Sequence, residues 1–262
     1  MIYLKSDNDI DAMRPAGELA YLLLEEIGPQ IKPGVNTEEL NTFVHNLTLQ
    51  HGGISAPLGY KGFPKSVCIS PNAVVCHGIP SQATILQEGD IVNVDVTPIL
   101  GGMHGDSSRT FFVGTTHSAE VQSLVHTTKQ ALMQAIATIQ PGVRLGDIGH
   151  CIQSIAEKAD LSVVKMFVGH GIGRHFHEDP MVYHHGKPNK GMLLEPGMTF
   201  TIEPMLNLGT ANCYILEDDW TAITKDGKWS AQFEHTLAIR SDWSVEILTL
   251  PLSHPEQTRT QT

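Results

Sequence analysis

The 262-residue chain has few of the features that mark membrane, secreted or nucleic-acid-binding proteins. No apolar run reaches the roughly 18 residues that a membrane-spanning helix needs. The four cysteines show no CxxC spacing, so the sequence indicates neither a disulfide framework nor a zinc clamp. Lys and Arg total 17 against 28 Asp and Glu, without a basic cluster, which argues against a nucleic-acid-binding patch. The N-terminus lacks the basic-then-apolar layout of a signal peptide, and a cytoplasmic location is expected.

Capping and breaker residues predict four helices, at about residues 6–27, 37–50, 118–139 and 145–159. The first helix opens on a capping box formed by Ser6 and Asp9, and Pro15 inside it predicts a kink or a later start. Thr37 and Ser118 are the expected N-caps of the second and third helices. Short strands are expected after each helix pair, so the sequence indicates that the same order of elements occurs twice.

Two sequence matches indicate an internal repeat. KPGVNTEEL matches QPGVRLGDI at an offset of 108 residues, from Pro33 to Pro141, and LQEGDIVNVDV matches LEPGMTFTIEP at the same offset. Either match alone is compatible with chance, but two at one offset favour duplication of a helix–helix–strand unit. We therefore expect one domain over residues 1–262, with halves at about 1–115 and 116–250 and a frayed tail at about 253–262. A pseudo-two-fold axis between the halves would bring Asp95 and Glu203 together.

The segment from Ile91 to Val113 reads as a β-hairpin, because apolar and polar residues alternate on either side of ILGG. Asp95 and Asp106 lie symmetrically about the Leu100/Gly101 junction. In a regular hairpin they would face each other, with Cβ atoms roughly 5 Å apart. Two like charges in that position repel, so the pair requires either a shared proton or a bound cation.

Four acidic residues occupy strand-like, apolar surroundings: Asp95, Asp106, Glu203 in TIEP and Glu234 in QFEH. For any one of them, an outward-facing position on a half-solvated strand is an equally good explanation. An outward-facing position is a less satisfactory explanation for all four together. If they are buried, each carboxylate is costly unless it is paired or liganded. Glycines on both sides of His170 in GHGIGRHFHEDP allow close backbone approach, which favours His170 as a ligand over a core histidine.

Four carboxylates and one imidazole are too anionic for a single tetrahedral zinc. They suit two divalent cations about 3.5–4 Å apart, which jointly lower the pKa of a shared water so that the resulting hydroxide attacks a peptide carbonyl. A glycosidase acid/base pair needs only two carboxylates, and it leaves Glu203, Glu234 and His170 without a role.

Five segments, taken in order, closely resemble the type I methionine aminopeptidases over nearly the whole chain: YKGFPKSVCISPNAVVCHGIP, NVDVTPILGGMHGDSSRTFFVG, GHGIGRHFHEDP, PGMTFTIEPM and SAQFEHT. The resemblance implies the pita-bread fold, an α/β (α+β) architecture of two pseudo-symmetric halves in which two pairs of helices flank an antiparallel sheet. It also implies an enzyme, a dinuclear metallo-exopeptidase that removes the initiator methionine from nascent proteins. Small second residues would be preferred, and a metal-bridging hydroxide would attack the peptide carbonyl.

The resemblance also implies roles for individual residues. The metal ligands would be Asp95, Asp106, His170, Glu203 and Glu234, with Asp106 and Glu234 bridging two ions of Co, Mn, Fe, Zn or Ni. His77 and His177 would handle the substrate, and Glu203 would also carry the proton from water to the leaving amine. The methionine pocket would comprise Tyr60, Phe63, Cys68, Phe176 and Trp220 with His77 at its edge, and such polarizable groups suit a thioether. Asn72, Val74 and Ser230 match a peripheral monovalent-cation site.

Three departures from the family pattern affect the expected substrate range and would fit a divergent second copy of the enzyme. Pro57 stands where the bacterial family usually has a cysteine, and Lys61 replaces a commoner histidine. The acids of Glu217–Asp219 precede Trp220 and are expected to touch the pocket or its rim.

Two rival functions use the same fold. An aminopeptidase acting on Xaa-Pro bonds, or a prolidase, would be expected to carry a large additional N-terminal domain. A metal-free binding protein would be expected to have lost ligands, yet all five are present. The expected partners are nascent polypeptide N-termini, compatible with a transient ribosome contact, and a monomer without membrane association is expected from family precedent.

Overall fold

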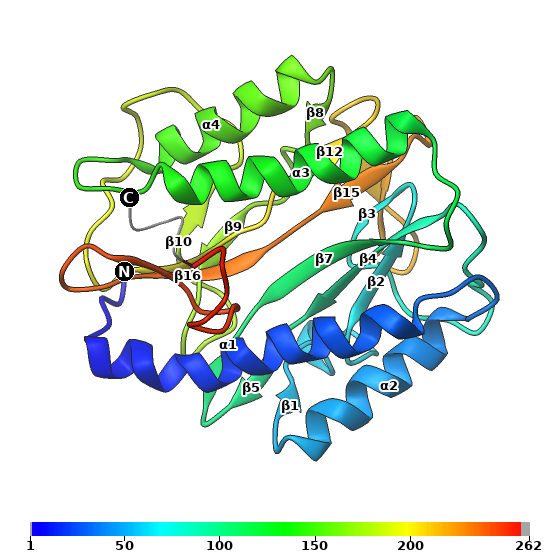
Figure 1. Cartoon of the computed structure of the whole chain (residues 1–262), viewed down its shortest axis with the longest axis horizontal. Helices are drawn as coiled ribbons and strands as arrows, with labels where there is room; N and C mark the ends of the chain where they lie inside the picture. The colour runs from blue at the N-terminus through cyan, green and yellow to red at the C-terminus, as the bar shows by residue number, and fades with distance from the viewer. Residues whose placement is uncertain (1, 258–262) are drawn as a thin grey trace.

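Four α-helices form two pairs that flank the strands within residues 2–257, which are the residues that the computed structural model describes. In the view of Figure 1, α1 (Asp7–Ile27) and α2 (Thr37–Gln50) run below the strands, and α3 (Ala119–Ala137) and α4 (Leu145–Lys158) run above them. Two short 3-10 helices, η1 (Gly28–Gln30) and η2 (Tyr60–Gly62), interrupt the connections of the first half. No described helix is long and apolar enough to cross a bilayer.

The helix boundaries follow from local capping, with two corrections to the sequence predictions. The predicted capping box of Ser6 and Asp9 is confirmed, but the helix does not start late. It continues through Pro15, whose missing N–H is tolerated because the flanking turns are buried against the core. The second helix is capped by Asn36, whose side chain accepts from the Glu39 N–H, so Thr37 is its first helical residue and not its cap. Ser118 caps α3 as predicted.

All the strand pairings are antiparallel. The largest sheet has the order β10 (Glu178–Val182), β9 (Gly169–Gly171), β11 (Thr199–Ile202), β16 (His235–Ile239) and β17 (Val245–Ile247). Four three-stranded sheets complete the described part: β2 (Cys68–Pro71), β4 (Ile91–Val96) and β7 (Ser107–Phe112); β15 (Ser230–Gln232), β12 (Met205–Asn207) and β8 (Ser162–Val163); β13 (Cys213–Ile215), β14 (Ala222–Thr224) and β3 (Val74–Cys76); β1 (Ile54–Ser55), β5 (Pro98–Leu100) and β6 (Met103–His104). The predicted combination of antiparallel sheets and two helix pairs is confirmed.

The same local features recur in both halves at the offset of the sequence matches. Two isolated β-bridges, Asn36 with Ile85 and Arg144 with Leu193, occupy equivalent positions before α2 and α4. The glycines that precede these helices, Gly34 and Gly142, both have a φ of 92°, a left-handed conformation that glycine adopts without steric cost. Equivalent turns therefore lead into equivalent helices.

The predicted hairpin exists, but its register differs from the prediction. The turn is centred on Gly101 and Gly102, both at positive φ (60° and 75°), and not on the Leu100/Gly101 junction. A two-residue turn with two positive φ angles matches the twist of the strands that it joins, and only glycine adopts it without strain at both positions. The tip, β5 and β6, pairs with β1 in a sheet of its own.

This shift changes the partners of the two aspartates. Asp95 pairs with Ser108, and Asp106 lies beyond the end of β7, where its Oδ1 accepts a hydrogen bond of 2.8 Å from Thr97 Oγ1. The prediction that Asp95 and Asp106 oppose each other directly is therefore wrong. Because the register moved by two residues, both side chains stay on the same face of the sheet.

Each helix pair covers its own hydrophobic core. Leu23 of α1 and Leu40 of α2 pack with Val92 and Val94 of β4. In the second half the larger cluster joins α3 and α4 to the five-stranded sheet, with Phe200 fully buried in it. Burial of each such side chain contributes about 1.5–3 kcal/mol to the free energy of folding. The two cores therefore stabilise the helix pairs against the strands that carry the site residues.

The C-terminal segment is not frayed in its described part. Gln257 Nε2 donates to the Leu250 carbonyl over 3.0 Å, and the His254 ring lies edge-on to Tyr21 at 5.9 Å. Glu256 and Lys129 form an ion pair of 2.9 Å. The predicted tail is therefore wrong for residues 253–257, and its remainder, 258–262, lies outside the described residues.

Candidate metal centre

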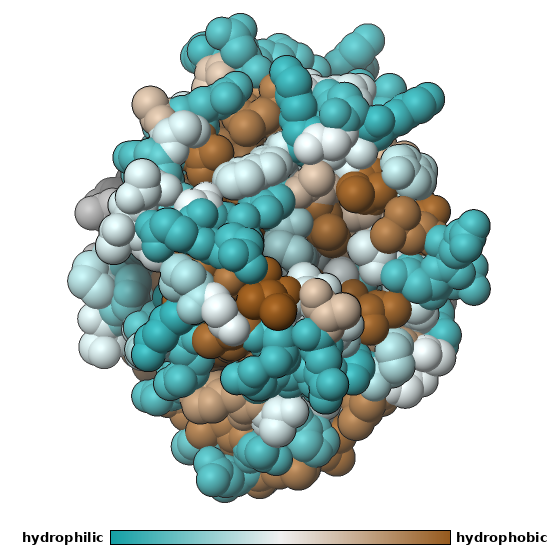
Figure 2. Space-filling model, turned by 90° about the vertical axis from the view of Figure 1, so that its right-hand side faces the viewer, coloured by the Kyte–Doolittle hydropathy of each residue, from teal (hydrophilic) through white to brown (hydrophobic). Residues whose placement is uncertain are grey.

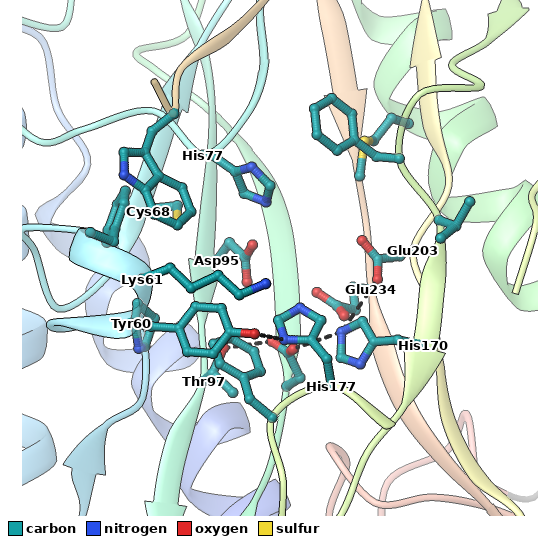
Figure 3. Close-up of a pocket in the computed structure, with 18 of the residues that line it drawn as sticks. Tyr60, Lys61, Cys68, His77, Asp95, Thr97, His170, His177, Glu203 and Glu234 are labelled. Carbon is teal, nitrogen blue, oxygen red and sulfur yellow. Dashed lines mark hydrogen bonds and ion pairs between the residues drawn. The ribbon is translucent and has the colours of Figure 1, made fainter. Parts of the chain in front are cut away.

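A cavity of about 300 Å³ lies between the two halves and collects the side chains that the sequence singled out. Figure 2 shows one face of the molecule, on which apolar side chains gather around a central hollow among polar ones. In Figure 3, Tyr60, Lys61, Cys68, His77 and Asp95 approach the cavity from one side. From the other side come the labelled side chains of the second half: His170, His177, Glu203 and Glu234.

Three of the predicted ligands converge most tightly. One ligand atom from each of Asp106, His170 and Glu234 lies within 4.8 Å of the others, and all three residues are buried. His170 Nε2 is 3.5 Å from Asp106 Oδ2 and 3.8 Å from Glu203 Oε1. Asp95 lines the same cavity. The structure therefore brings all five predicted ligands to one place.

Glu203, Asp95 and Glu234 have raised pKa values in this cluster. Burial raises the pKa of Glu203 to about 7, with Asp106 acting in the same direction against the opposing effect of His170. Burial, followed by the neighbouring carboxylates, also raises the pKa of Asp95 and of Glu234 well above the ordinary range. Burial alone would lower the pKa of His170, but its hydrogen bond to Asp106 and the charge of Glu203 together raise it to about 8.

These two features fit a divalent cation. Convergent carboxylate oxygens with one imidazole form a ligand set that several divalent metals accept. Burial is the main cause of the raised pKa values of Asp95 and Glu234, and the neighbouring carboxylates add to it. No Lys or Arg ion-pairs with these carboxylates among the described residues, so holding them ionised is electrostatically costly. A bound cation would remove that electrostatic cost.

Hydrogen-bond partners that the sequence reasoning missed hold Glu203 and Asp106. Glu203 Oε1 accepts from Thr201 Oγ1 over 2.9 Å, and the backbone N–H of Glu203 donates to His184 Nε2 over 3.1 Å. Thr97 fixes Asp106 in the same way, as described above. Thr201 lies two residues before Glu203, so strand periodicity alone would have placed it on the same face. His184 carried no comparable signal, because it comes from a distant loop.

The two substrate-handling histidines predicted from the resemblance line the cavity as neutral imidazoles. Burial is the main cause that lowers the pKa of His177 to about 4, and burial also lowers the pKa of His77. His177 Nδ1 lies 3.0 Å from the Tyr60 hydroxyl, and its ring centroid is 4.2 Å from that of His170. His77 has a φ of 57° and lies edge-on to Phe167 at 5.2 Å.

The predicted pocket residues form one apolar wall. The rings of Phe63 and Trp220 meet edge-on with their centroids 5.1 Å apart, and the ring centroids of Tyr60 and Phe176 are 4.9 Å apart. Burial raises the pKa of the Cys68 thiol well above its usual value, so Cys68 lines the cavity as an uncharged group. Lining residues that the sequence reasoning missed are Thr97, Met166, Phe167, Val168 and Met205.

The acidic stretch before Trp220 does not line the cavity as expected. Glu217, Asp218 and Asp219 are exposed and absent from its lining, whereas Trp220 is part of it. Asp218 instead closes a local turn, in which its carboxylate accepts from the N–H groups of Trp220 and Thr221. Partial burial, the largest single effect, raises the pKa of Asp218, but its hydrogen bonds together outweigh burial and lower the pKa. The stretch therefore shapes the loop that carries Trp220.

Comparison with known proteins gives consistent matches. Residues 11–241 match the metallopeptidase family M24. Methionine aminopeptidase A of Synechocystis is 56% identical over 249 residues, which cover 95% of this chain and 98% of that protein. Methionine aminopeptidase of Escherichia coli K12 is 48% identical over 251 residues, covering 95% and 94%. The crystal structure of methionine aminopeptidase from Rickettsia prowazekii superposes with a TM-score of 0.93 at 47% identity, over 95% of this chain and all of that one.

Proposed function

The chain belongs to the metallopeptidase family M24, and we propose that it removes the N-terminal methionine from polypeptides with the aid of two divalent metal ions. The observation that carries this proposal is the convergence of Asp106, His170 and Glu234 beside an apolar cavity. Methionine aminopeptidases at about half identity cover nearly the whole chain, and the pita-bread fold that they share is present throughout.

We assign five residues to the metal site: Asp95, Asp106, His170, Glu203 and Glu234. Asp106 and Glu234 lie with His170 in the tightest part of the cluster, and we propose that these two carboxylates would be shared by both ions. Divalent cations held there would supply a water of lowered pKa and would polarise the scissile carbonyl. Mn, Fe, Co, Zn and Ni all accept such ligands, and cellular availability selects among them.

Glu203 is proposed to carry the proton. Its carboxylate lies in the cluster, with Oε1 3.8 Å from His170 Nε2, and a carboxylate beside the attacking water can accept a proton and return it, as general acid–base catalysis requires. Glu203 Oε1 is fixed by Thr201, so the carboxylate keeps one orientation while it takes a proton from the attacking water and delivers it to the leaving amine. Delivery of the proton to the leaving amine prevents the peptide nitrogen from leaving as an anion.

His77 and His177 are proposed to orient the peptide on either side of the scissile bond. A neutral imidazole offers one donor and one acceptor, and it does not repel the α-ammonium group of the substrate. Tyr60 helps to fix the ring of His177 through the contact at 3.0 Å. Both imidazoles can therefore bind carbonyl and amide groups of a peptide without carrying a charge of their own.

The aromatic and sulfur-bearing wall is proposed to accept the methionine side chain. Thioethers pack favourably on aromatic rings, and Phe63, Phe176 and Trp220 supply three. The enclosed shape supports a preference for small second residues, because a bulky residue next to the scissile bond would meet the rim. The expected substrates are nascent polypeptide N-termini in the cytoplasm, bound by a single catalytic domain acting as a monomer.

A peripheral monovalent cation is proposed at Asn72, Val74 and Ser230. Its support is local: the Asn72 carbonyl accepts from the Ser230 N–H over 2.9 Å, and Asn72 has a φ of 52°. Ser230 Oγ is buried and has no hydrogen-bond partner among residues 2–257. This site lies at the junction of β3 and β15 and would stabilise it.

The test is peptide cleavage by protein reconstituted separately with Mn, Fe, Co or Zn. Methionine release from Met-Ala-Ser should greatly exceed release from Met-Leu-Ser, and Xaa-Pro peptides should be left intact. Preferential Xaa-Pro cleavage would identify an aminopeptidase P or prolidase instead. Absence of methionine release with every metal, together with less than one metal per chain by elemental analysis, would favour a binding protein.

A further inference from the structure

Lys61 occupies an unusual position at the mouth of the cavity. It lies in the turn Gly59–Gly62, where its own φ is 46° and both glycines have positive φ. Residues with a side chain adopt this conformation rarely, because the Cβ approaches the backbone too closely. The turn directs Tyr60 and Lys61 together into the lining of the cavity, and Figure 3 shows Lys61 extending toward the opposite side, where His177 lies.

The ammonium group of Lys61 has no protein anion to bind. Three other lysines, Lys5, Lys65 and Lys129, form ion pairs with glutamates. Lys61 forms none within the described chain, and its Nζ lies 5.2 Å from the centroid of the Tyr60 ring. It is also the only Lys or Arg among the described residues that line the cavity.

The positive charge of Lys61 is not needed for the interior of the site. When the proposed metals are bound, they neutralise the carboxylates, and His77 and His177 are neutral. Lys61 instead adds to the positive potential that opposes protonation of His177. An exposed, unpaired cation at the mouth is therefore available to the substrate.

The geometry of a bound peptide indicates which part of the substrate meets Lys61. With the methionine side chain in the pocket and the scissile bond between the two histidines, the chain must leave past the mouth. Each further residue spans at most about 3.3–3.6 Å, and the second residue is held close to the scissile bond and must be small. The third residue is the first whose side chain can extend freely at the mouth.

Resting on the proposed function, we propose that Lys61 is a specificity-determining residue whose ammonium group binds a carboxylate on the third residue of the substrate. The acidic stretch of Glu217–Asp219 would favour the opposite charge, but those side chains do not line the cavity. One of them, Asp218, is already engaged in its own turn. Since Lys61 is exposed to solvent, the preference should be modest, up to about fivefold.

The experiment measures kcat/KM on peptides that differ only at the third residue: Met-Ala-Asp, Met-Ala-Asn and Met-Ala-Lys, each followed by the same neutral sequence. The wild-type enzyme should prefer Asp over Asn by about two- to fivefold, with Lys last, and the preference should shrink as salt is raised. Lys61→Gln should abolish the difference between Asp and Asn. Lys61→Arg should retain it, because the charge remains.

Lys32→Gln serves as the matched control, because it removes one exposed positive charge far from the cavity lining and should leave the Asp-to-Asn ratio unchanged. A wild-type ratio of one, a preference for Lys, or an unchanged ratio in Lys61→Gln would overturn the proposal. Methionine release from the Met-Ala-Asn peptide reports on the proposed function independently. If that release is absent, the proposed function fails; if it is present without charge preference, only the role of Lys61 fails.

Discussion

The two halves of the molecule present carboxylates to the metal site from equivalent strands, but with different registers. In the first half Asp95 pairs with Ser108, and Asp106 lies beyond the strand end. In the second half the last pair is Ile202 with His235, so Glu203 and Glu234 are the next residues outward on the two strands. The facing carboxylates expected in the first half thus occur in the second. A duplicated scaffold has kept the site while its registers diverged.

The connections between these strands differ more than the strands do. The first half joins β4 to β7 through the short β5–β6 tip, whereas the second joins β11 to β16 through a segment that includes the β13–β14 hairpin. The loop of that hairpin carries Trp220, which lines the cavity. The shared scaffold therefore carries the proposed metal ligands, and one of the asymmetric connections carries a residue proposed for substrate recognition.

The largest expected effect comes from removing one proposed metal ligand from either half in turn. If the halves contribute equally, Asp106→Asn and Glu234→Gln should each lower kcat/KM on Met-Ala-Ser by about a thousandfold, because each variant lacks one of the anionic ligands proposed for the metal site. Metal content by elemental analysis should fall in parallel. Glu26→Gln, an exposed position on α1, should change neither quantity. Near-normal metal content and activity in either variant would show that its half is dispensable for metal binding.

A smaller effect is expected on the stability of the metal-free protein as pH rises. Burial raises the pKa of Glu203 to about 7, and the carboxylates near His170 raise its pKa to about 8. Groups whose pKa is raised on folding stabilise the protein at low pH and lose that contribution as pH rises through the folded-state value. The Glu203 contribution is lost by about pH 7 and that of His170 around pH 8, so the apparent Tm in a chelator should fall between pH 7.5 and 8.5.

The buried histidines do not reverse this trend. Burial lowers the pKa of His184 and of His235 to about 3, and unfolded histidines titrate near 6.5, so above pH 7.5 both are neutral in the folded chain and almost wholly neutral in the unfolded chain. Adding Mn at one fixed concentration should raise the Tm, because the cation binds the folded chain. The gain should be larger at pH 8.5 than at pH 7.5, since Mn competes with protons for these ligands, and differential scanning calorimetry measures it. A metal-free Tm that rises over this range would contradict the electrostatic account.

Much of the architecture was readable because local signals agreed with each other. Helix caps, proline–glycine breaks and the 108-residue offset predicted both helix pairs and the alignment of Asp95 with Glu203. The hairpin register was not readable, because ILGG contains two adjacent glycines and alternation alone fits more than one turn centre. The contact of His184 with the Glu203 N–H depends on tertiary structure, for which the sequence carries no periodic signal.

The smallest effect tests the equivalence of the two helix pairs at one position. Asn36 and Arg144 precede α2 and α4 at equivalent positions, but only the Asn36 side chain accepts a hydrogen bond from the first turn. Asn36→Ala should therefore lower the free energy of unfolding by about 1 kcal/mol, as the loss of an N-cap does. Arg144→Ala should cost less, because its side chain donates only an exposed hydrogen bond to Gly191. Chemical denaturation of the metal-loaded variants measures both, and equal losses would mean that the two helices are capped alike despite their different residues.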